Sequence, residues 1–208
     1  MAFQADTIIG SDGLESNFDP QAYLWDFYQR VDDPAMQMMI MLLPTIAQRI
    51  DCCDNLLDFG AGPTIYVSIV FRNKATNIYL ADYLPQNREE LLRWKAGESA
   101  FDWTSVLKMI ATVEGSGWLQ LKDMEELTKS KVRSIFHCNC HIKPSISAPK
   151  TLQNNFDMVV SILCLEYCCS SETEYREAVG NVADQVKPGG ELQAPFAKFN
   201  VIDCRVGL

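Results

Sequence analysis

The sequence predicts an α/β fold built on a doubly wound, mostly parallel sheet, and three observations support this prediction. Short apolar runs alternate with segments of helical periodicity from residue 18 onwards. A glycine-rich segment, residues 60–63, follows the first apolar run, and Asp82 follows the second. Alternating strands and helices of this length are typical of parallel sheets, which bind ligands at the carboxyl ends of their strands. We therefore expect one Rossmann-like domain over residues 18–208, preceded by a flexible arm over residues 1–17.

Seven segments show the patterns expected of helices. Asp19 and Pro20 provide an N-cap and a first-turn proline for the first segment, and Pro34 lies near the start of the second. The Lys187-Pro-Gly-Gly190 segment is a stop signal for the last one. The expected helices span residues 18–31, 33–50, 64–72, 85–95, 101–110, 123–132 and 172–186.

Four apolar runs are the expected strands. The fourth is apolar almost throughout, as strands buried on both faces of a parallel sheet are. The expected strands span residues 55–59, 77–81, 135–140 and 156–165.

Composition limits the class of protein and its partners. The chain has 208 residues, of which 48% are hydrophobic, and a formal net charge of −9. This length suits a single α/β domain, and the negative charge does not suit a nucleic-acid backbone or an anionic membrane surface. The sequence shows neither a secretory signal nor an apolar run of the roughly 18 residues that a membrane span needs. We therefore expect a cytoplasmic protein without nucleic-acid or membrane partners.

The glycine-rich segment and the acid after it predict a nucleoside-binding site. Gly60 and Gly62 lack a Cβ, so the backbone can turn sharply and a ligand can lie close to it. Asp82 ends the next strand, where a carboxylate can accept hydrogen bonds from both ribose hydroxyls. The same layout binds nicotinamide dinucleotides, but their fingerprint has a third glycine where this chain has Ile65. Pro63 also removes a backbone donor at the helix start, where a pyrophosphate would bind.

These residues favour S-adenosylmethionine, which carries no phosphate. A nicotinamide-dinucleotide-dependent reductase remains an alternative, as does a tight turn without a ligand.

The combined motifs resemble the family of nicotinamide, phenylethanolamine and indolethylamine (thioether) N-methyltransferases. The motifs occur in the family's order between Phe18 and Gly190. They are Phe18-Asp-Pro-Gln-Ala-Tyr-Leu-Trp-Asp-Phe-Tyr28, Leu57-Asp-Phe-Gly-Ala-Gly-Pro-Thr-Ile-Tyr66, Ala81-Asp-Tyr-Leu-Pro-Gln-Asn87, Ala100-Phe-Asp-Trp103, Val160-Ser-Ile-Leu-Cys-Leu165 and Lys187-Pro-Gly-Gly190. The resemblance implies a class I methyltransferase fold. It also implies transfer of a methyl group from S-adenosyl-L-methionine to a nitrogen of a small amine or a nicotinamide-like pyridine.

The resemblance also implies the site residues. Tyr23 would act at the reaction centre as well as in cofactor binding. At the end of the third strand, the family usually has an aspartate and an apolar residue where this chain has Asn139 and Cys140; an asparagine oxygen can still accept a hydrogen bond. The implied cofactor-binding residues are Tyr23, Tyr28, Gly60, Gly62, Thr64, Tyr66, Asp82, Tyr83, Asn87, Asn139, Cys140 and Ile162.

The cysteines indicate reduced thiols rather than a disulfide framework. The chain has 8 cysteines, several of them inside apolar runs. The segment His137-Cys-Asn-Cys-His141 resembles a metal cluster, but on a strand its cysteines and histidines would point to opposite faces. We therefore expect no metal site.

The match to the family weakens after Gly190. The family continues with a fifth strand that ends in an acidic or polar substrate contact, followed by further strands. Here Pro195 cannot donate within a central strand, and Phe196 lies about where the family has its acidic substrate contact. We expect the last strands to be missing, so that a chain that binds the cofactor without turnover is an alternative to an active enzyme. We also expect a monomer whose exposed sheet edge can self-associate.

Overall fold

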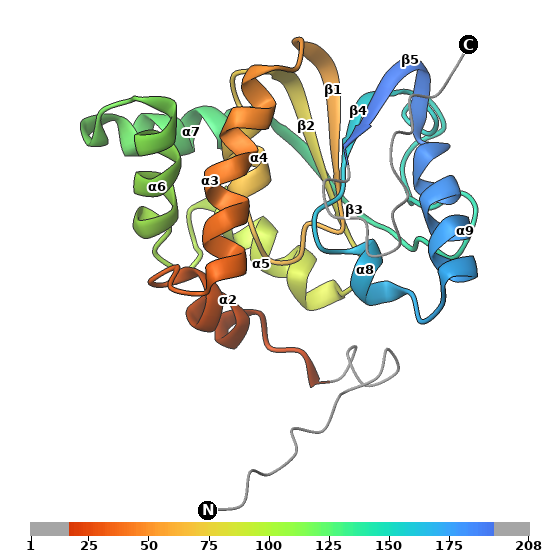
Figure 1. Ribbon diagram of the computed structural model, residues 1–208, viewed down its shortest axis with the longest axis horizontal. Coiled ribbons are helices and arrows are strands. Elements are labelled where there is room, and N and C mark those ends of the chain that lie inside the picture. The colour runs from red at the N-terminus through yellow and green to blue at the C-terminus, as the bar shows by residue number, and fades with distance from the viewer. Residues whose placement is uncertain (1–16, 194–208) are drawn as a thin grey trace, which may run out of the picture.

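The computed structural model describes residues 17–193, so most of the predicted arm, together with Pro195 and Phe196, lies outside the described residues. The described part contains a five-stranded sheet in the order β3-β2-β1-β4-β5, with every neighbouring pair parallel. The chain winds outward from β1 through β2 to β3 and then returns to place β4 beside β1. Helices lie on both sides of the sheet (Figure 1). The predicted doubly wound parallel fold is confirmed.

The two N-terminal helices, α2 (Pro20–Tyr28) and α3 (Pro34–Gln48), begin at capping residues. The side chains of Asp19 and Asp33 accept hydrogen bonds from backbone N–H groups of the first turns. A proline at the first helical position follows each cap, where its missing N–H is not needed. Helix α3 continues past Pro44.

The first strand–helix units match their predictions closely. Strand β1 (Cys53–Phe59) leads through the glycine-rich loop to α4 (Tyr66–Phe71), and β2 (Ala75–Asp82) leads to α5 (Pro85–Ala96). Helix α5 ends at Gly97, which takes the left-handed conformation that glycine adopts without strain (φ 78°).

The third strand begins and ends earlier than expected. Helix α6 (Thr104–Glu114), the 3-10 turn η1 (Trp118–Gln120) and α7 (Leu121–Lys131) precede β3 (Val132–His137). The last residue of β3, His137, pairs with Asp82, where β2 ends. The chain after His137 therefore has no neighbouring strand to pair with. The predicted strand over residues 135–140 is therefore corrected, and residues 140 and 141 lie in a turn.

The fourth strand is shorter than its apolar run. Strand β4 (Phe156–Val160) stops where its pairing with β1 stops. The rest of the predicted strand, residues 161–165, forms a bend and the first residue of the short helix α8 (Leu165–Cys168), so the prediction is corrected. Helix α9 (Glu172–Ala183) and β5 (Val186–Gln193) follow.

The Lys187-Pro-Gly-Gly190 segment lies inside β5 rather than at the end of a helix. The predicted helix over residues 172–186 ends at Ala183, and the pairing of β4 with β5 shifts register across the segment, which forms a bulge. A Cβ on Gly190 would lie 2.6 Å from the carbonyl oxygen of Asp157, so this close approach requires glycine.

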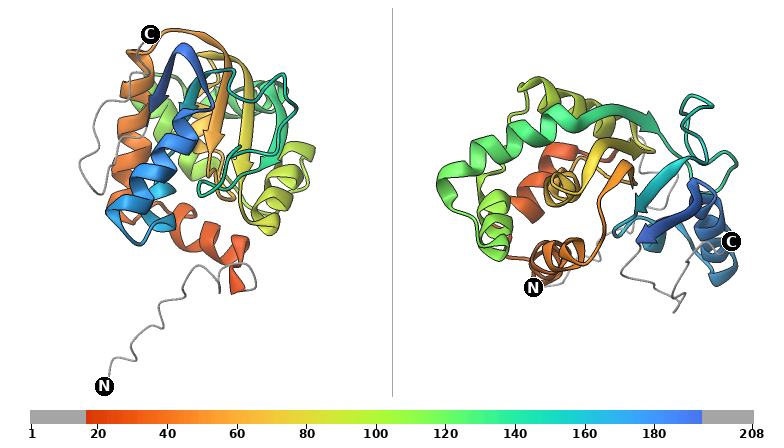
Figure 2. Two further views of the ribbon diagram at one scale, coloured as in Figure 1. Left: turned by 90° about the vertical axis from the view of Figure 1, so that its right-hand side faces the viewer. Right: turned by 90° about the horizontal axis from the view of Figure 1, so that it is seen from above.

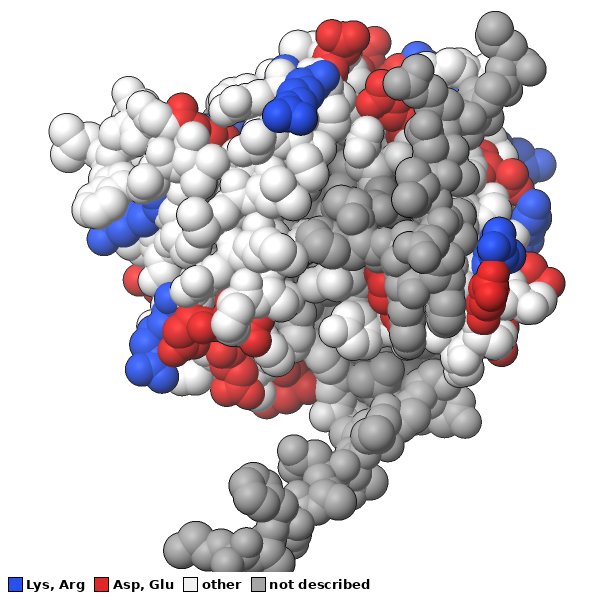
Figure 3. Space-filling view, in the orientation of Figure 1, with Lys and Arg blue, Asp and Glu red and all other residues white. Residues whose placement is uncertain are grey.

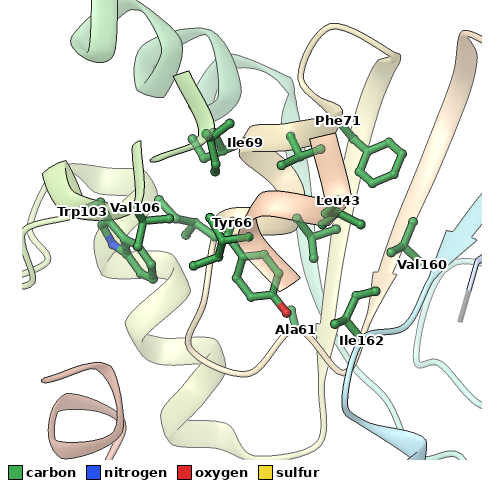
Figure 4. Close-up of a cluster of buried hydrophobic side chains, with 14 of the residues drawn as sticks. Leu43, Ala61, Tyr66, Ile69, Phe71, Trp103, Val106, Val160 and Ile162 are labelled. Carbon is green, nitrogen blue, oxygen red and sulfur yellow. The ribbon is translucent and has the colours of Figure 1, made fainter. Parts of the chain in front are cut away.

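The core consists of two hydrophobic clusters, one on each face of the sheet. Successive residues of β1 point to opposite faces, so Leu56 packs on the side of α3 to α7 and Leu57 packs on the side of α9. The view from above in Figure 2 separates these two sides. Figure 4 shows part of the larger cluster, which includes Leu43 of α3 and Val160 of β4.

The surface of the described residues agrees with the acidic composition. On the face seen in Figure 3, Asp and Glu side chains gather near α2, while Lys and Arg side chains are scattered. Among residues 17–193, no helix has the length and apolar character needed to cross a membrane.

Candidate active site

All five parallel strands end at one edge of the sheet, and the predicted site residues lie on or next to the segments at this edge. Helices α2, α5 and α8 lie at the same edge (Figure 1). Strand order reverses between the neighbouring strands β1 and β4. Doubly wound sheets bind ligands at such a switch point, so the fold itself places the candidate site here.

The glycine-rich loop is tied to the end of β2. Gly60 and Gly62 adopt φ values of 75° and 61°, in the left-handed region that favours glycine. The N–H groups of Gly60 and Ala61 donate to the carbonyl oxygen of Ala81 at 2.8 and 3.0 Å. The side chain of Cys164 fills the space that a Cβ on Gly60 would need, whereas nothing lies within 4 Å of a Cβ on Gly62. The first glycine is therefore required by packing as well as by backbone conformation.

Asp82 is held in place by three donors. Its Oδ2 accepts from the N–H of Gly62 at 2.8 Å. Its Oδ1 accepts from the N–H of Leu84 and from Nδ2 of Asn87, both at 2.9 Å. Burial raises the pKa of Asp82, and these hydrogen bonds oppose the rise. The carboxylate is thus fixed between the glycine-rich loop and α5, at the end of β2 where the sequence predicts an acid.

Two buried oxygens beside this carboxylate have no hydrogen-bond partner among the described residues. They are Oδ2 of Asp58 and Oδ1 of Asn87. Burial, and then the negative charge of Asp82, raises the pKa of Asp58 well above its ordinary value. Asp58 was not among the predicted site residues, although an acid inside the apolar run 55–59 was a signal that could have identified it.

The predicted tyrosines form one connected group. Tyr28 stacks on Tyr66 with ring centroids 5.8 Å apart, and the centroid of Tyr23 lies 5.9 Å from that of Tyr28. Tyr23 is also close enough to Asp82 for the carboxylate to raise its pKa, although burial is the larger cause. Tyr28 and Tyr66 are almost fully buried. The structure therefore brings α2, the helix after the glycine-rich loop and the end of β2 together.

Trp103, the last residue of the Ala100-Phe-Asp-Trp103 motif, also belongs to this group, although no role was predicted for it. The ring of Trp103 packs against Tyr28, with centroids 5.9 Å apart, and its Nε1 has no partner among the described residues. Figure 4 shows the Tyr66 hydroxyl directed at Ala61, with Ile162 nearby. The hydroxyl of Thr64 donates to the carbonyl oxygen of Ala61 at 2.7 Å.

The three remaining predicted residues lie at the ends of β2 and β3. Tyr83 is exposed, and its ring centroid lies 5.4 Å from that of His137. The side-chain oxygen of Asn139 accepts from the N–H of His141 at 2.9 Å. Cys140 is buried beside Cys168, and hydrogen bonding by the thiols of Cys140 and Cys164 lowers the pKa of Cys168 to about 3.

Comparisons with known proteins agree with the sequence motifs. The model of the NNMT/PNMT/TEMT family matches residues 6–200. The chain is 35% identical to nicotinamide N-methyltransferase of Caenorhabditis elegans over 187 residues, which are 86% of this chain and 68% of that protein. It is 32% identical to indolethylamine N-methyltransferase of Oryctolagus cuniculus over 88% of this chain and 71% of that protein. It is 29% identical to human phenylethanolamine N-methyltransferase over 66% of this chain and 49% of that protein. The predicted resemblance is confirmed.

Proposed function

This chain belongs to the NNMT/PNMT/TEMT family, and we propose that it transfers a methyl group from S-adenosyl-L-methionine to a nitrogen of a small amine or pyridine. The predicted enzyme class and cofactor are those of an S-adenosylmethionine-dependent N-methyltransferase, and the family membership supports both over the dinucleotide-dependent reductase. The observation in the structure that carries the proposal is the carboxylate of Asp82, fixed against the glycine-rich loop beside the tyrosine group.

The residues at this edge suit the cofactor chemically. The ribose hydroxyls and the ammonium group of S-adenosylmethionine are hydrogen-bond donors, and the site offers buried acceptors on Asp58, Asp82 and Asn87. Two of these acceptors have no partner among the described residues, and a buried polar atom without a partner costs about 1–3 kcal/mol. A ligand that donates to these atoms removes that cost. We assign the ribose to Asp82 and the methionine part to the glycine-rich loop with Asp58.

The aromatic group orients the reactants and excludes water. S-adenosylmethionine supplies an activated methyl group when bound, so the protein has no nucleophile or metal to provide for this step. Tyr23 and Tyr28, with Tyr66 behind them, present aromatic faces to the reaction centre, and such faces stabilise cations by about 0.5–2 kcal/mol each. Positioning of the acceptor nitrogen supplies much of the remaining rate. We assign Tyr23 to the reaction centre because it is the least buried of the three tyrosines and lies near Asp82.

The other predicted contacts complete the cofactor site. Asn139 and Cys140 lie at the end of β3, on the side of Asp82 away from β1, and we place the adenine there together with Tyr83. Thr64 and Ile162 form walls of the methionine part. We further propose that the protein acts as a cytoplasmic monomer.

Calorimetry with S-adenosylhomocysteine tests cofactor binding. Two hydrogen bonds to a charged acceptor contribute about 1.5–3 kcal/mol each, so Asp82→Ala should weaken binding at least a hundredfold. Asp54→Ala is the matched control, because Asp54 is an exposed aspartate at the opposite end of β1. Unchanged affinity in the Asp82 variant would overturn the ribose assignment, and absence of binding to the folded wild-type chain would overturn the cofactor assignment.

Turnover is measured separately with labelled S-adenosylmethionine and three acceptors: nicotinamide, tryptamine and phenylethanolamine. Methylation of any of them supports the proposed function. Cofactor binding without methylation of these or other small amines favours the alternative of a binding protein without turnover. Titration with a nicotinamide dinucleotide in the same calorimeter tests the reductase alternative directly.

A further inference from the structure

Five cysteines gather behind the glycine-rich loop, although they come from segments far apart in the sequence. Cys138 and Cys140 follow β3, whereas Cys164, Cys168 and Cys169 lie in or next to α8. Each thiol is close enough to perturb the pKa of at least one of the others, and the Sγ atoms of Cys164 and Cys168 are 3.9 Å apart. None of these thiols has a role in the proposed methyl transfer except Cys140, which we placed at the adenine.

A histidine completes the cluster. His141 is exposed, and its Nε2 lies 3.0 Å from the carbonyl oxygen of Cys168. The ligand atoms of Cys140, His141 and Cys169 all lie within 4.8 Å of one another. A zinc ion binds cysteine sulfur at about 2.3 Å and histidine nitrogen at about 2.0–2.1 Å, so two sulfurs on one tetrahedral ion lie about 3.8 Å apart. Side-chain movements of about 1 Å are therefore enough to close the three ligands around one ion.

Cys168 is the candidate for the fourth ligand. It precedes Cys169 in the chain, and its carbonyl oxygen lies 3.0 Å from Nε2 of His141. Cys168 and His141 are exposed, whereas Cys140 and Cys169 are buried, so an ion can reach the cluster from solvent and still be held by buried sulfurs. Three cysteines and one histidine form a common structural zinc site.

A metal site was not expected from the sequence because residues 137–141 were predicted to lie in a strand. In the structure β3 ends at His137, and Cys140 and His141 lie in a turn where both approach Cys169. Cys140 and His141 are therefore not forced to point to opposite faces of a strand, which was the reason for expecting no metal site. Cys168 and Cys169 lie in and next to α8, and only the fold brings them close to Cys140 and His141.

We propose that Cys140, His141, Cys168 and Cys169 bind one zinc ion, which links the loop after β3 to α8. Binding replaces the protons of the thiols that are still protonated, and these protons go to the solvent. The site lies directly behind the glycine-rich loop, because Cys164, one helical turn before Cys168, packs against Gly60.

Titration of the reduced full-length chain with Co²⁺ tests this proposal without any measurement of methyl transfer. Co²⁺ in a tetrahedral thiolate site gives a sulfur-to-metal charge-transfer band in the near ultraviolet and intense d–d bands in the visible. We expect these bands to saturate at an equimolar ratio of metal to chain and to disappear when Zn²⁺ is added. Absence of a charge-transfer band in the folded chain would overturn the proposal.

Two variants and a control assign the ligands. Cys169→Ser removes one of three thiolate ligands, so it should weaken Co²⁺ binding and lower the charge-transfer intensity at saturation by about a third. His141→Ala should weaken Co²⁺ binding at least tenfold and shift the d–d bands. Cys52→Ser is the control, because Cys52 is exposed and precedes β1 at the opposite edge of the sheet. Since His141 is exposed, its variant keeps the fold even if the buried Cys169 variant does not. Spectra of the His141 variant identical to those of the wild type would refute the assigned ligand set.

Discussion

Replacement of each loop glycine by alanine should separate backbone strain from packing at this site. Both glycines have positive φ, where an L-residue costs about 1–2 kcal/mol. For Gly62→Ala this is the whole cost, because nothing lies within 4 Å of the new Cβ. For Gly60→Ala the new Cβ overlaps Sγ and Cβ of Cys164, closer than the 3.0 Å below which real Cβ contacts essentially do not occur. Overpacking adds about 1–3 kcal/mol, so we expect a total of about 2–5 kcal/mol.

Urea denaturation followed by circular dichroism measures both values. The overlap predicts a specific rescue: Cys164→Gly should restore more of the stability of Gly60→Ala than Cys164→Ala does, because alanine removes the overlap with Sγ but keeps the overlap with Cβ. A double-mutant cycle then gives the interaction energy between the two positions. Equal losses of stability in the two glycine variants, or no rescue by Cys164→Gly, would refute the packing argument.

Two further predictions concern buried charges. Since burial raises the pKa of Asp58 in the folded state, its contribution to stability is complete below the unfolded pKa of about 3.9 and is lost as pH rises through the folded pKa. Asp58→Asn should therefore melt at a higher temperature than the wild type at pH 8 and show a smaller advantage at pH 4, and a pH-independent difference would contradict this. Glu114 accepts two hydrogen bonds from Arg72, at 2.9 and 2.5 Å, in a mostly buried ion pair. Glu114→Ala leaves the buried arginine without its ion-pair partner, so we expect a loss of about 3–5 kcal/mol in urea denaturation. Glu172→Ala, which breaks an exposed pair with Arg176, should lose no more than about 0.5 kcal/mol, and equal losses would refute the importance of burial.

Local sequence determined the parts of the site that lie within a few residues of a strand end. The apolar run before Gly60 and the acid after the second run are read directly from the sequence, because a strand of a parallel sheet must deliver its following loop to the carboxyl edge. The cap at Asp19 was also predicted, since a helix start needs acceptors for its first N–H groups. Periodicity predicted a helix at Phe18 to Tyr28, but only the family resemblance assigned its tyrosines to the site.

Strand ends were predicted less well because pairing, not hydrophobicity, sets them. Residues 161–165 are as apolar as β4, yet β4 ends at Val160, where its pairing with β1 ends. The bulge at residues 187–190 follows from the same cause: the chain must keep pairing with β4 while its glycines pass close to that strand. Neither fact is contained in the local pattern.

The sequence by itself therefore determined the family and the fold class, and it predicted the position of Asp82 at the end of a strand, where we propose that it binds the ribose. Only the tertiary structure decided what lies next to these residues: Cys164 over Gly60, Trp103 against Tyr28, and the thiols of α8 beside Cys140. The physical reason is that periodicity and turn chemistry act over a few residues. Crossover connections, by contrast, bring together loops that lie twenty or more residues apart, and the contacts between those loops depend on the complete sheet.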